Sequence, residues 1–388
     1  MMTLNLKKLI GSLCVFGFEG TETPKHIESF IQDWNLGGVI LFKRNIESLE
    51  QLAALNQALI KLSDHPLLLG VDHEGGRVFR LPAPFTHFPP LQKIGDCIRK
   101  QKNPQLAFQL GQIMARELCA VGFNLNFAPV TDVNSNPQNP IIGDRAFSAD
   151  AAEVGPWCHE FLQGLASEGI IGCAKHFPGH GDTEQDSHLE LPVVNKTEAK
   201  LWDCELRPFR DLMSLRAMSS LRRQGPMMGR GNLPFFPLMT AHVKYPALDP
   251  DWPATLSSKI LTDLLRKKLD YQGVIFSDDF EMKGISAYYP IPEAAEQFLH
   301  AGGDAILLCH HEEPQINTLE HLLRLAEKNS QFRDLLSEKQ ARLSSLSLQT
   351  VLANLSQVGC KEHLSFAKSF RLPSAESGAI VRNLVNKN

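Results

Sequence analysis

Eight apolar runs, each followed by a polar and then an amphipathic stretch, dominate the pattern of this chain. The runs cover residues 9–18, 38–42, 67–71, 124–129, 169–175, 237–243, 273–277 and 305–309. Short apolar runs that alternate with amphipathic segments are typical of repeated βα units and a parallel sheet. Eight such units predict an α/β fold, a single (β/α)₈ barrel of the TIM type.

Helical periodicity fills the space between several of these runs, most clearly over residues 105–121, 151–168, 256–269 and 292–300. We expect one catalytic domain over residues 1–340, followed by a C-terminal helix and tail over 341–388 that packs on the barrel or extends from it. Residues 213–236, with four arginines among Met, Gly and Ser, are predicted to be an exposed insertion or surface loop before the sixth strand.

The amino-acid composition and net charge indicate what kind of molecule the protein binds. Hydrophobic residues make up 43% and charged residues 21% of the 388 residues, which favours an ordinary globular protein over a disordered or membrane-embedded one. The net charge of −4 provides no basic field for a nucleic acid. We expect a monomer that binds a small neutral or mildly charged substrate and neither nucleic acid nor membrane.

The cysteines and the N-terminal residues indicate the cellular compartment of the protein. Eight scattered cysteines without a CxxC pair suit a reducing environment, and we expect a cytoplasmic protein. Lys7 and Lys8 precede an apolar run, which resembles the start of a secretory signal. The competing interpretation, which we favour, is that this run is the first barrel strand, because it contains glycines and lacks a small-residue cleavage site.

Polar residues follow the third run, at the end of the barrel where such folds place their active sites. This stretch contains Asp72, Glu74, Arg77 and Arg80. An aspartate can accept two sugar hydroxyls, and an arginine offers fixed donors to acyl or carboxylate oxygens. For Glu74 and Arg77 a structural ion pair is the alternative.

The polar loop after the fourth run begins near Asp132 and includes Asp144 and Arg145. Arg145 either reaches the substrate or joins Asp144 in fastening the loop, and the sequence leaves both open.

The densest group of reactive side chains follows the fifth run. Residues 175–188 hold three histidines, three acidic residues and a Pro-Gly turn with a second glycine. A solvated loop needs neither the glycines nor the histidines, so this segment is predicted to be functional. His176, His180, Asp182 and His188 are acceptable zinc ligands, but their spacing matches no standard metal pattern.

The seventh run ends in two adjacent carboxylates, Asp278 and Asp279. Successive side chains of a strand point to opposite sides, so only one of the two is expected to face the barrel centre. A carboxylate there is well placed to attack an anomeric carbon. The other is expected to cap the following turn.

Together these motifs resemble glycoside hydrolase family 3, specifically its single-domain β-N-acetylglucosaminidase branch, over roughly residues 10–308. The most specific pieces are residues 175–188 and 264–278. The resemblance implies that Asp278 is the nucleophile, His188 the acid/base and Asp186 its orienting partner. It also implies a set of sugar-binding residues: Asp72, Arg80, Arg145, Lys175 and His176. Two features depart from the family pattern, namely His73 in place of a more usual glutamine, and the 213–236 segment.

The resemblance further implies a retaining β-N-acetylhexosaminidase that removes terminal β-linked GlcNAc from muropeptides in peptidoglycan recycling, through a glycosyl-aspartate intermediate and without cofactor or metal. Histidine then replaces the usual second carboxylate, and its unperturbed pKa of about 6.5 suits proton transfer in both directions near neutral pH. Three alternatives stay open: a β-glucosidase or β-xylosidase of the same family, a metal-dependent hydrolase built on the histidine-rich loop, and a sugar-binding module without catalysis. The last is disfavoured because the catalytic set is intact.

Overall fold

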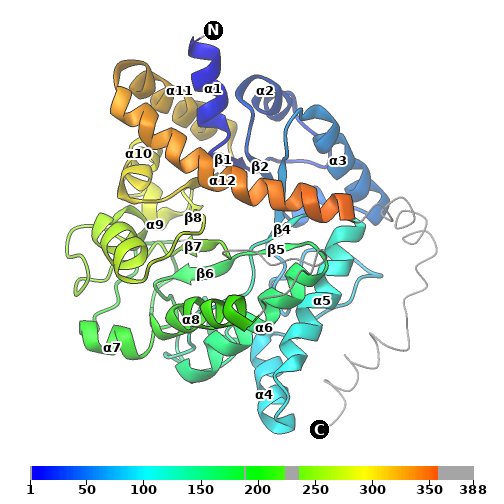
Figure 1. Cartoon of the computed structure of the whole chain (residues 1–388), viewed down its shortest axis with the longest axis vertical. Coiled ribbons are helices and arrows are strands. Elements are labelled where there is room, and N and C mark those ends of the chain that lie inside the picture. The colour runs from blue at the N-terminus through cyan, green and yellow to red at the C-terminus, as the bar shows by residue number, and fades with distance from the viewer. Residues whose placement is uncertain (1, 188, 223–235, 357–388) are drawn as a thin grey trace.

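The computed structural model describes residues 2–187, 189–222 and 236–356 (Figure 1). Short parallel strands form one sheet, with helices packed around it. In chain order the strands are β1 (Cys14–Phe16), β2 (Gly38–Leu41), β3 (Leu68–Val71), β4 (Leu125–Asn126), β5 (Ile171–Gly172), β6 (Ala174–Phe177), β7 (Leu238–Thr240), β8 (Ile275–Asp279) and β9 (Ala305–Leu308).

The sheet curls into a nearly closed barrel, in the order β5-β4-β3-β2-β1-β9-β8-β7-β6, and each pair of neighbouring strands in this order is parallel. Strands β5 and β6 end the order on opposite sides, yet only Cys173 separates them in the chain. The backbone of Lys175 also pairs with the segment after β4, where Thr131 N donates to Lys175 O over 2.5 Å and Lys175 N to Pro129 O over 3.2 Å. One broken strand therefore closes the barrel, and the predicted eight-unit α/β barrel is confirmed.

Helices cover the outside of the barrel (Figure 1). They are α1 (Met2–Gly11), α2 (Lys25–Trp34), α3 (Leu49–Leu62), α4 (Leu91–Gln101), α5 (Gln105–Ala120), α6 (Ala151–Ser167), α7 (Glu198–Asp203), α8 (Arg207–Arg222), α9 (Lys283–Ser286), α10 (Ile291–Ala301), α11 (Glu312–Lys328) and α12 (Ser330–Ser356), with the π-helix η4 (Lys259–Lys268) and the 3₁₀ turns η1 (Lys43–Asn45), η2 (Gly143–Arg145) and η3 (Ala254–Leu256). Across the described ranges, none of these helices is both long and apolar enough to cross a membrane.

The N-terminal run differs from its prediction. Residues 2–11 are helical, and only Cys14–Phe16 pairs as a strand. The helix is amphipathic, with Leu6 and Ile10 buried and Lys7 and Lys8 partly exposed, so packing decides its conformation.

The predicted insertion differs as well. Residues 213–222 continue helix α8, whose face carries the buried Phe209 and Leu212, because no Gly or Pro interrupts the chain before Gly225. Residues 223–235 lie outside the described residues. At the other end, α12 runs across the predicted domain boundary at residue 340 as one helix, and that boundary stays a prediction.

The amino end of the barrel is covered. Helix α12 lines a cavity together with residues that precede β1, β2 and β3, and Arg342 Nη1 donates over 2.8 Å to Asp304 Oδ1, just before β9. Strand residues are buried on both faces, as expected for a parallel sheet between helices. The opposite, carboxyl ends of the strands are where polar side chains gather.

Candidate active site

A cavity of about 350 Å³ opens at the carboxyl ends of the strands. Its walls bring together the predicted nucleophile and all the predicted sugar-binding residues, which are Asp72, Arg80, Arg145, Lys175, His176 and Asp278. Asp186 precedes Ser187, which also lines the cavity. His188, the predicted acid/base, lies outside the described residues.

A buried network of two cations and two carboxylates forms one wall. Lys175 Nζ lies 2.7 Å from both Asp72 Oδ1 and Glu74 Oε1. Arg145 donates two hydrogen bonds of 2.8 Å to the same Glu74 carboxylate and a third, of 3.0 Å, to Ile141 O. The side chains of Glu74 and Lys175 are only 1% and 3% exposed. The network therefore ties together the chain segments that follow β3 and β4 and the strand β6.

The electrostatics of this network keep Glu74 and Lys175 charged. Burial raises the pKa of Glu74, but Arg145 and Lys175 lower it by more, so the pKa falls well below its ordinary value. Burial lowers the pKa of Lys175, but Asp72 and Glu74 outweigh it and the pKa is raised. Glu74 does not pair with Arg77, which instead donates to Pro140 O and lies 3.8 Å from Asp144 at the surface. The alternative of a Glu74–Arg77 ion pair is therefore wrong, and Glu74 is the anchor of the site.

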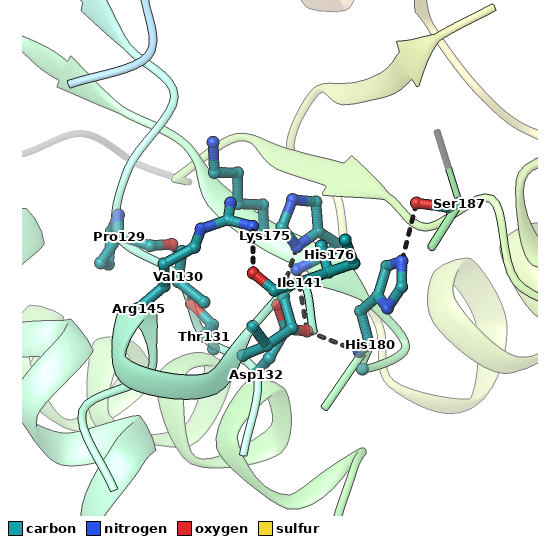
Figure 2. Close-up of polar contacts among 12 residues, drawn as sticks. Pro129, Val130, Thr131, Asp132, Ile141, Arg145, Lys175, His176, His180 and Ser187 are labelled. Atoms are coloured by element: carbon teal, nitrogen blue, oxygen red, sulfur yellow. Dashed lines mark hydrogen bonds and ion pairs between the residues drawn. The ribbon is translucent and has the colours of Figure 1, made fainter. Parts of the chain in front are cut away.

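Asp132 organises the histidines (Figure 2). Its Oδ2 lies 2.7 Å from His176 Nδ1, and its Oδ1 accepts the backbone N–H of His180 over 2.7 Å. Burial raises the pKa of Asp132, but His176 and His180 outweigh it and the pKa is lowered. Asp132 thereby fixes the orientation of the His176 ring at the cavity wall.

His180 has a structural environment. Its ring nitrogens contact Thr183 Oγ1 and Ser187 Oγ, each over 2.9 Å, and Figure 2 shows the contact with Ser187. The side chain is buried. Burial, followed by the nearby His176, lowers the pKa of His180 to about 4. A neutral imidazole with both nitrogens engaged is a poor proton donor at neutral pH.

The start of the loop that leads to Asp186 is held firmly. Lys196 Nζ lies 2.8 Å from Asp182 Oδ1 and 2.6 Å from Glu205 Oε1. Gly179 has φ +135°, and a Cβ there would lie 2.7 Å from the Cβ of Glu205, so this turn requires glycine. Tyr245 Oη donates to Gly179 O. The loop is thus anchored up to Ser187 by buried polar contacts.

The two adjacent aspartates of β8 have different surroundings. Asp279 Oδ1 accepts the backbone N–H groups of Glu281 and Cys309 over 3.1 and 3.2 Å, and its Oδ2 lies 3.3 Å from His310 Nε2. Asp278 Oδ1 accepts the N–H of Asp279 over 2.9 Å, and its side chain is partly exposed to the cavity. Asp279 caps the turn after β8, as expected for one of the pair. Both aspartates line the cavity, so the expectation that only one faces the site is not met.

Arg80 has a donor that the described residues do not use. Its Nε is buried without a hydrogen-bond partner among them, although the side chain lines the cavity. Beside it, burial and the charge of Arg80 lower the pKa of His73 to about 3, so this ring is neutral. A buried, unpaired guanidinium N–H at a cavity wall is suited to a ligand oxygen.

Several residues of the site were not singled out from sequence. Asp132, Glu281 and His310 each come shortly after a strand, and position alone could have marked them. Their partners lie elsewhere in the chain, as when Glu281 Oε2 accepts the N–H of His310 over 2.6 Å. Among the described residues no group of three or more His, Cys, Asp or Glu side chains is arranged to hold a metal ion.

Comparisons with known proteins agree with this arrangement. The model of the "Glycosyl hydrolase family 3 N terminal domain" matches residues 5–220 and 235–346. A beta-hexosaminidase from Nitrosomonas eutropha is 38% identical over 279 residues, which cover 71% of this chain and 74% of that protein. The structure of a family 3 beta-N-acetylglucosaminidase from Paenibacillus sp. has a TM-score of 0.80 and 36% identity, over 89% of this chain and 63% of that one. NagZ from Neisseria gonorrhoeae, in complex with N-trifluoroacetyl-D-glucosamine, has a TM-score of 0.69 and 32% identity, over 92% of this chain and 96% of that one.

The buried network predicts a large effect of Glu74→Gln on stability. The substitution leaves Lys175 and Arg145 with one counter-charge fewer in a buried place, and breaking such a pair costs about 3–5 kcal/mol. Chemical denaturation at pH 7 measures the change. Asp144→Asn is the matched control, because it removes the same charge from a half-exposed pair with Arg77 and should cost about 1 kcal/mol or less. Equal losses for the two variants would contradict this account.

The same variant should change the pH dependence of unfolding. Because the folded-state pKa of Glu74 is lowered, its contribution is present above its unfolded value of about 4.3 and is lost as the pH falls from there toward the folded value. The difference in free energy of unfolding between wild type and Glu74→Gln should therefore shrink as the pH is lowered below about 4.3.

Proposed function

The chain belongs to glycosyl hydrolase family 3 and is a β-hexosaminidase of that family, and from this premise we propose that it is a retaining β-N-acetylhexosaminidase that removes terminal β-linked GlcNAc from muropeptides. One observation carries the proposal: Asp278 lies in the same cavity as the buried Asp72–Lys175–Glu74–Arg145 network. We propose that the protein acts in the cytoplasm, as a monomer, in peptidoglycan recycling.

The network and its neighbours would hold the sugar. Asp72 is fixed by Lys175 at the cavity wall and can accept sugar hydroxyls. Arg145 donates three of its five N–H groups to Glu74 and to the carbonyl oxygen of Ile141. The other two N–H groups can donate to a substrate oxygen. His176, oriented by Asp132, and the unused Nε of Arg80 complete the set of polar groups. A ligand complex of the gonococcal relative, with an N-acylated glucosamine, supports this size and class of sugar.

The reaction would proceed in two displacements. In the first, Asp278 attacks the anomeric carbon while His188 gives its proton to the leaving oxygen, and a glycosyl ester of Asp278 forms. In the second, His188 takes a proton from water, the water attacks the same carbon, and the ester bond breaks. Two inversions retain the configuration. Asp186 would hold the His188 imidazole in the correct tautomer and stabilise its cation.

His180 is the other candidate for the acid, and its environment argues against it. Its ring is buried, contacts Thr183 and Ser187, and has a pKa lowered to about 4. Glu74 is excluded in the same way, since its pKa is lowered and it is bound by two cations. The environments of His180 and Glu74 therefore support the assignment of the acid/base role to His188.

A comparison of chromogenic substrates tests the sugar preference. The aryl β-N-acetylglucosaminide should be hydrolysed with a higher kcat/KM than the aryl β-glucoside or β-xyloside, because the polar wall suits an acylamino sugar. A reversed order would favour the β-glucosidase or β-xylosidase alternative. The same assay after prolonged EDTA treatment should show full activity, whereas a loss that zinc restores would favour the metal-dependent hydrolase.

The nucleophile assignment predicts that Asp278→Ala abolishes turnover and that a 5-fluoro glycosyl inhibitor labels Asp278, because a covalent ester requires that carboxylate. Peptide mapping of the trapped enzyme identifies the labelled residue. Asp279→Asn is the matched control: its carboxylate holds backbone N–H groups, so we expect reduced stability and labelling still at residue 278. Labelling of Asp279 in the wild type would identify Asp279 as the nucleophile instead.

The acid/base assignment predicts a loss of about 10² to 10⁴ in rate for His188→Ala on a substrate with a poor leaving group. An activated aryl glycoside departs with little protonation, so its glycosylation step should suffer much less. Deglycosylation still needs a base, so glycosyl-enzyme should accumulate and azide should restore turnover by attacking the ester. Asp186→Asn should show a milder form of the same defect. Equal slowing of good and poor leaving groups, without azide rescue, would refute the role of His188.

A further inference from the structure

Exposed apolar side chains are concentrated at one side of the cavity mouth. Among the described residues five large hydrophobic side chains are exposed, and four of them lie in three loops that follow neighbouring strands. Leu189 and Val193 follow β6, Trp252 follows β7 and Tyr288 follows β8, whereas the fifth, Ile60, lies on α3. The side chains of Leu189 and Tyr288 are 67% and 56% exposed. Concentrations of this kind mark binding surfaces more often than scattered single residues do.

Backbone contacts join the three loops into one surface. Lys244 N donates to Pro192 O over 2.8 Å, and Val194 N donates to Lys244 O over 2.9 Å. Lys244 also pairs with Pro253, the residue after Trp252. The rings of Trp252 and Tyr289 stack with centroids 5.4 Å apart. We call the surface formed by Leu189, Val193, Trp252, Tyr288 and Tyr289 the aromatic ledge.

The aromatic ledge adjoins the cavity. Met282 lines the cavity, and two successive turns lead from it to the tyrosines: Met282 O accepts Ile285 N over 3.0 Å, and Ile285 O accepts the N–H groups of Tyr288 and Tyr289, each over 2.9 Å. On the other side Ser187 lines the cavity and accepts the N–H of Gly284 over 2.9 Å. The ledge therefore begins where the cavity wall ends.

The position of the ledge in the chain indicates which part of a substrate it meets. A cavity of about 350 Å³ is at the small end of ligand pockets, and we assign it to the one sugar that is released. In the proposed mechanism His188 protonates the leaving oxygen, and His188 directly precedes Leu189 of the ledge. The group attached to that oxygen must then lie on the ledge side of the cavity.

We propose that the aromatic ledge binds the leaving-group sugar of the substrate, the ring joined to the terminal β-linked residue. This inference rests on the proposed function and adds a second binding subsite to it. Tyr and Trp combine a flat apolar face with a polar edge, which matches a sugar ring that has apolar C–H faces and a rim of hydroxyls. The ledge selects substrates with a sugar as leaving group by stabilising their binding.

The test compares two substrates whose leaving groups are both alcohols: a β-linked disaccharide of N-acetylglucosamine, and methyl β-N-acetylglucosaminide. The selectivity, kcat/KM for the disaccharide over that for the methyl glycoside, is measured for full-length wild type, Trp252→Ala and Tyr288→Ala. We expect the selectivity to fall about 2- to 10-fold in each variant, the range for one aromatic contact, mainly through KM. Trp252→Phe, which retains a flat apolar ring, should recover most of it.

Ile60→Ala is the matched control, because it removes an exposed apolar side chain from α3 and should leave the selectivity unchanged. If Trp252→Ala misfolds, Tyr288→Ala and Trp252→Phe still decide the question. The proposal is overturned if Tyr288→Ala and Trp252→Ala both keep the wild-type selectivity. It is also overturned if folded variants lose kcat/KM equally on the disaccharide and the methyl glycoside. If the wild type is a dimer and the variants are monomers with unchanged selectivity, the ledge is instead an interface with a second copy of the chain. If wild type cleaves neither substrate, the proposed function fails first.

Discussion

Glu74 is charged and buried, and the mouth of the barrel is organised around neutralising it. Two cations from distant parts of the chain, Arg145 and Lys175, meet at this one carboxylate. A buried charge without a partner is costly, so the segments that follow β3 and β4 and the strand β6 can take only relative positions that keep these contacts. Because Lys175 also holds Asp72, the same constraint that closes the wall presents a carboxylate to the cavity.

In the proposed mechanism, aspartates of the same site have either a structural or a reactive role. The oxygens of Asp279 and Asp132 contact backbone N–H groups and the rings of His310 and His176. Asp278 accepts the N–H of Asp279 and is partly exposed in the cavity. Hydrogen bonds to a carboxylate favour its ionised form and fix its position, which suits a supporting role. Support and reaction are therefore assigned by surroundings rather than by residue type.

The loop after β6 connects these two functions. Its first part is held by Asp132, Lys196 and Tyr245 up to Ser187, and its continuation beyond residue 188 reaches exposed apolar residues beside the cavity. In the proposed mechanism the residue between these two parts transfers the proton.

The sequence by itself determined the barrel, because alternation of apolar runs and amphipathic segments is a local pattern, and it determined which polar residues end each strand. It also pointed to Asp72, which follows an apolar run, and through the family resemblance it pointed to Lys175 and Asp278. Only the tertiary structure decided the partners: Glu74 with Arg145 rather than Arg77, Asp132 with His176, and Asp279 with the backbone of Cys309. Which side chains pair depends on how closely segments dozens of residues apart in the chain approach once the barrel closes. The periodicity of the sequence does not determine that distance.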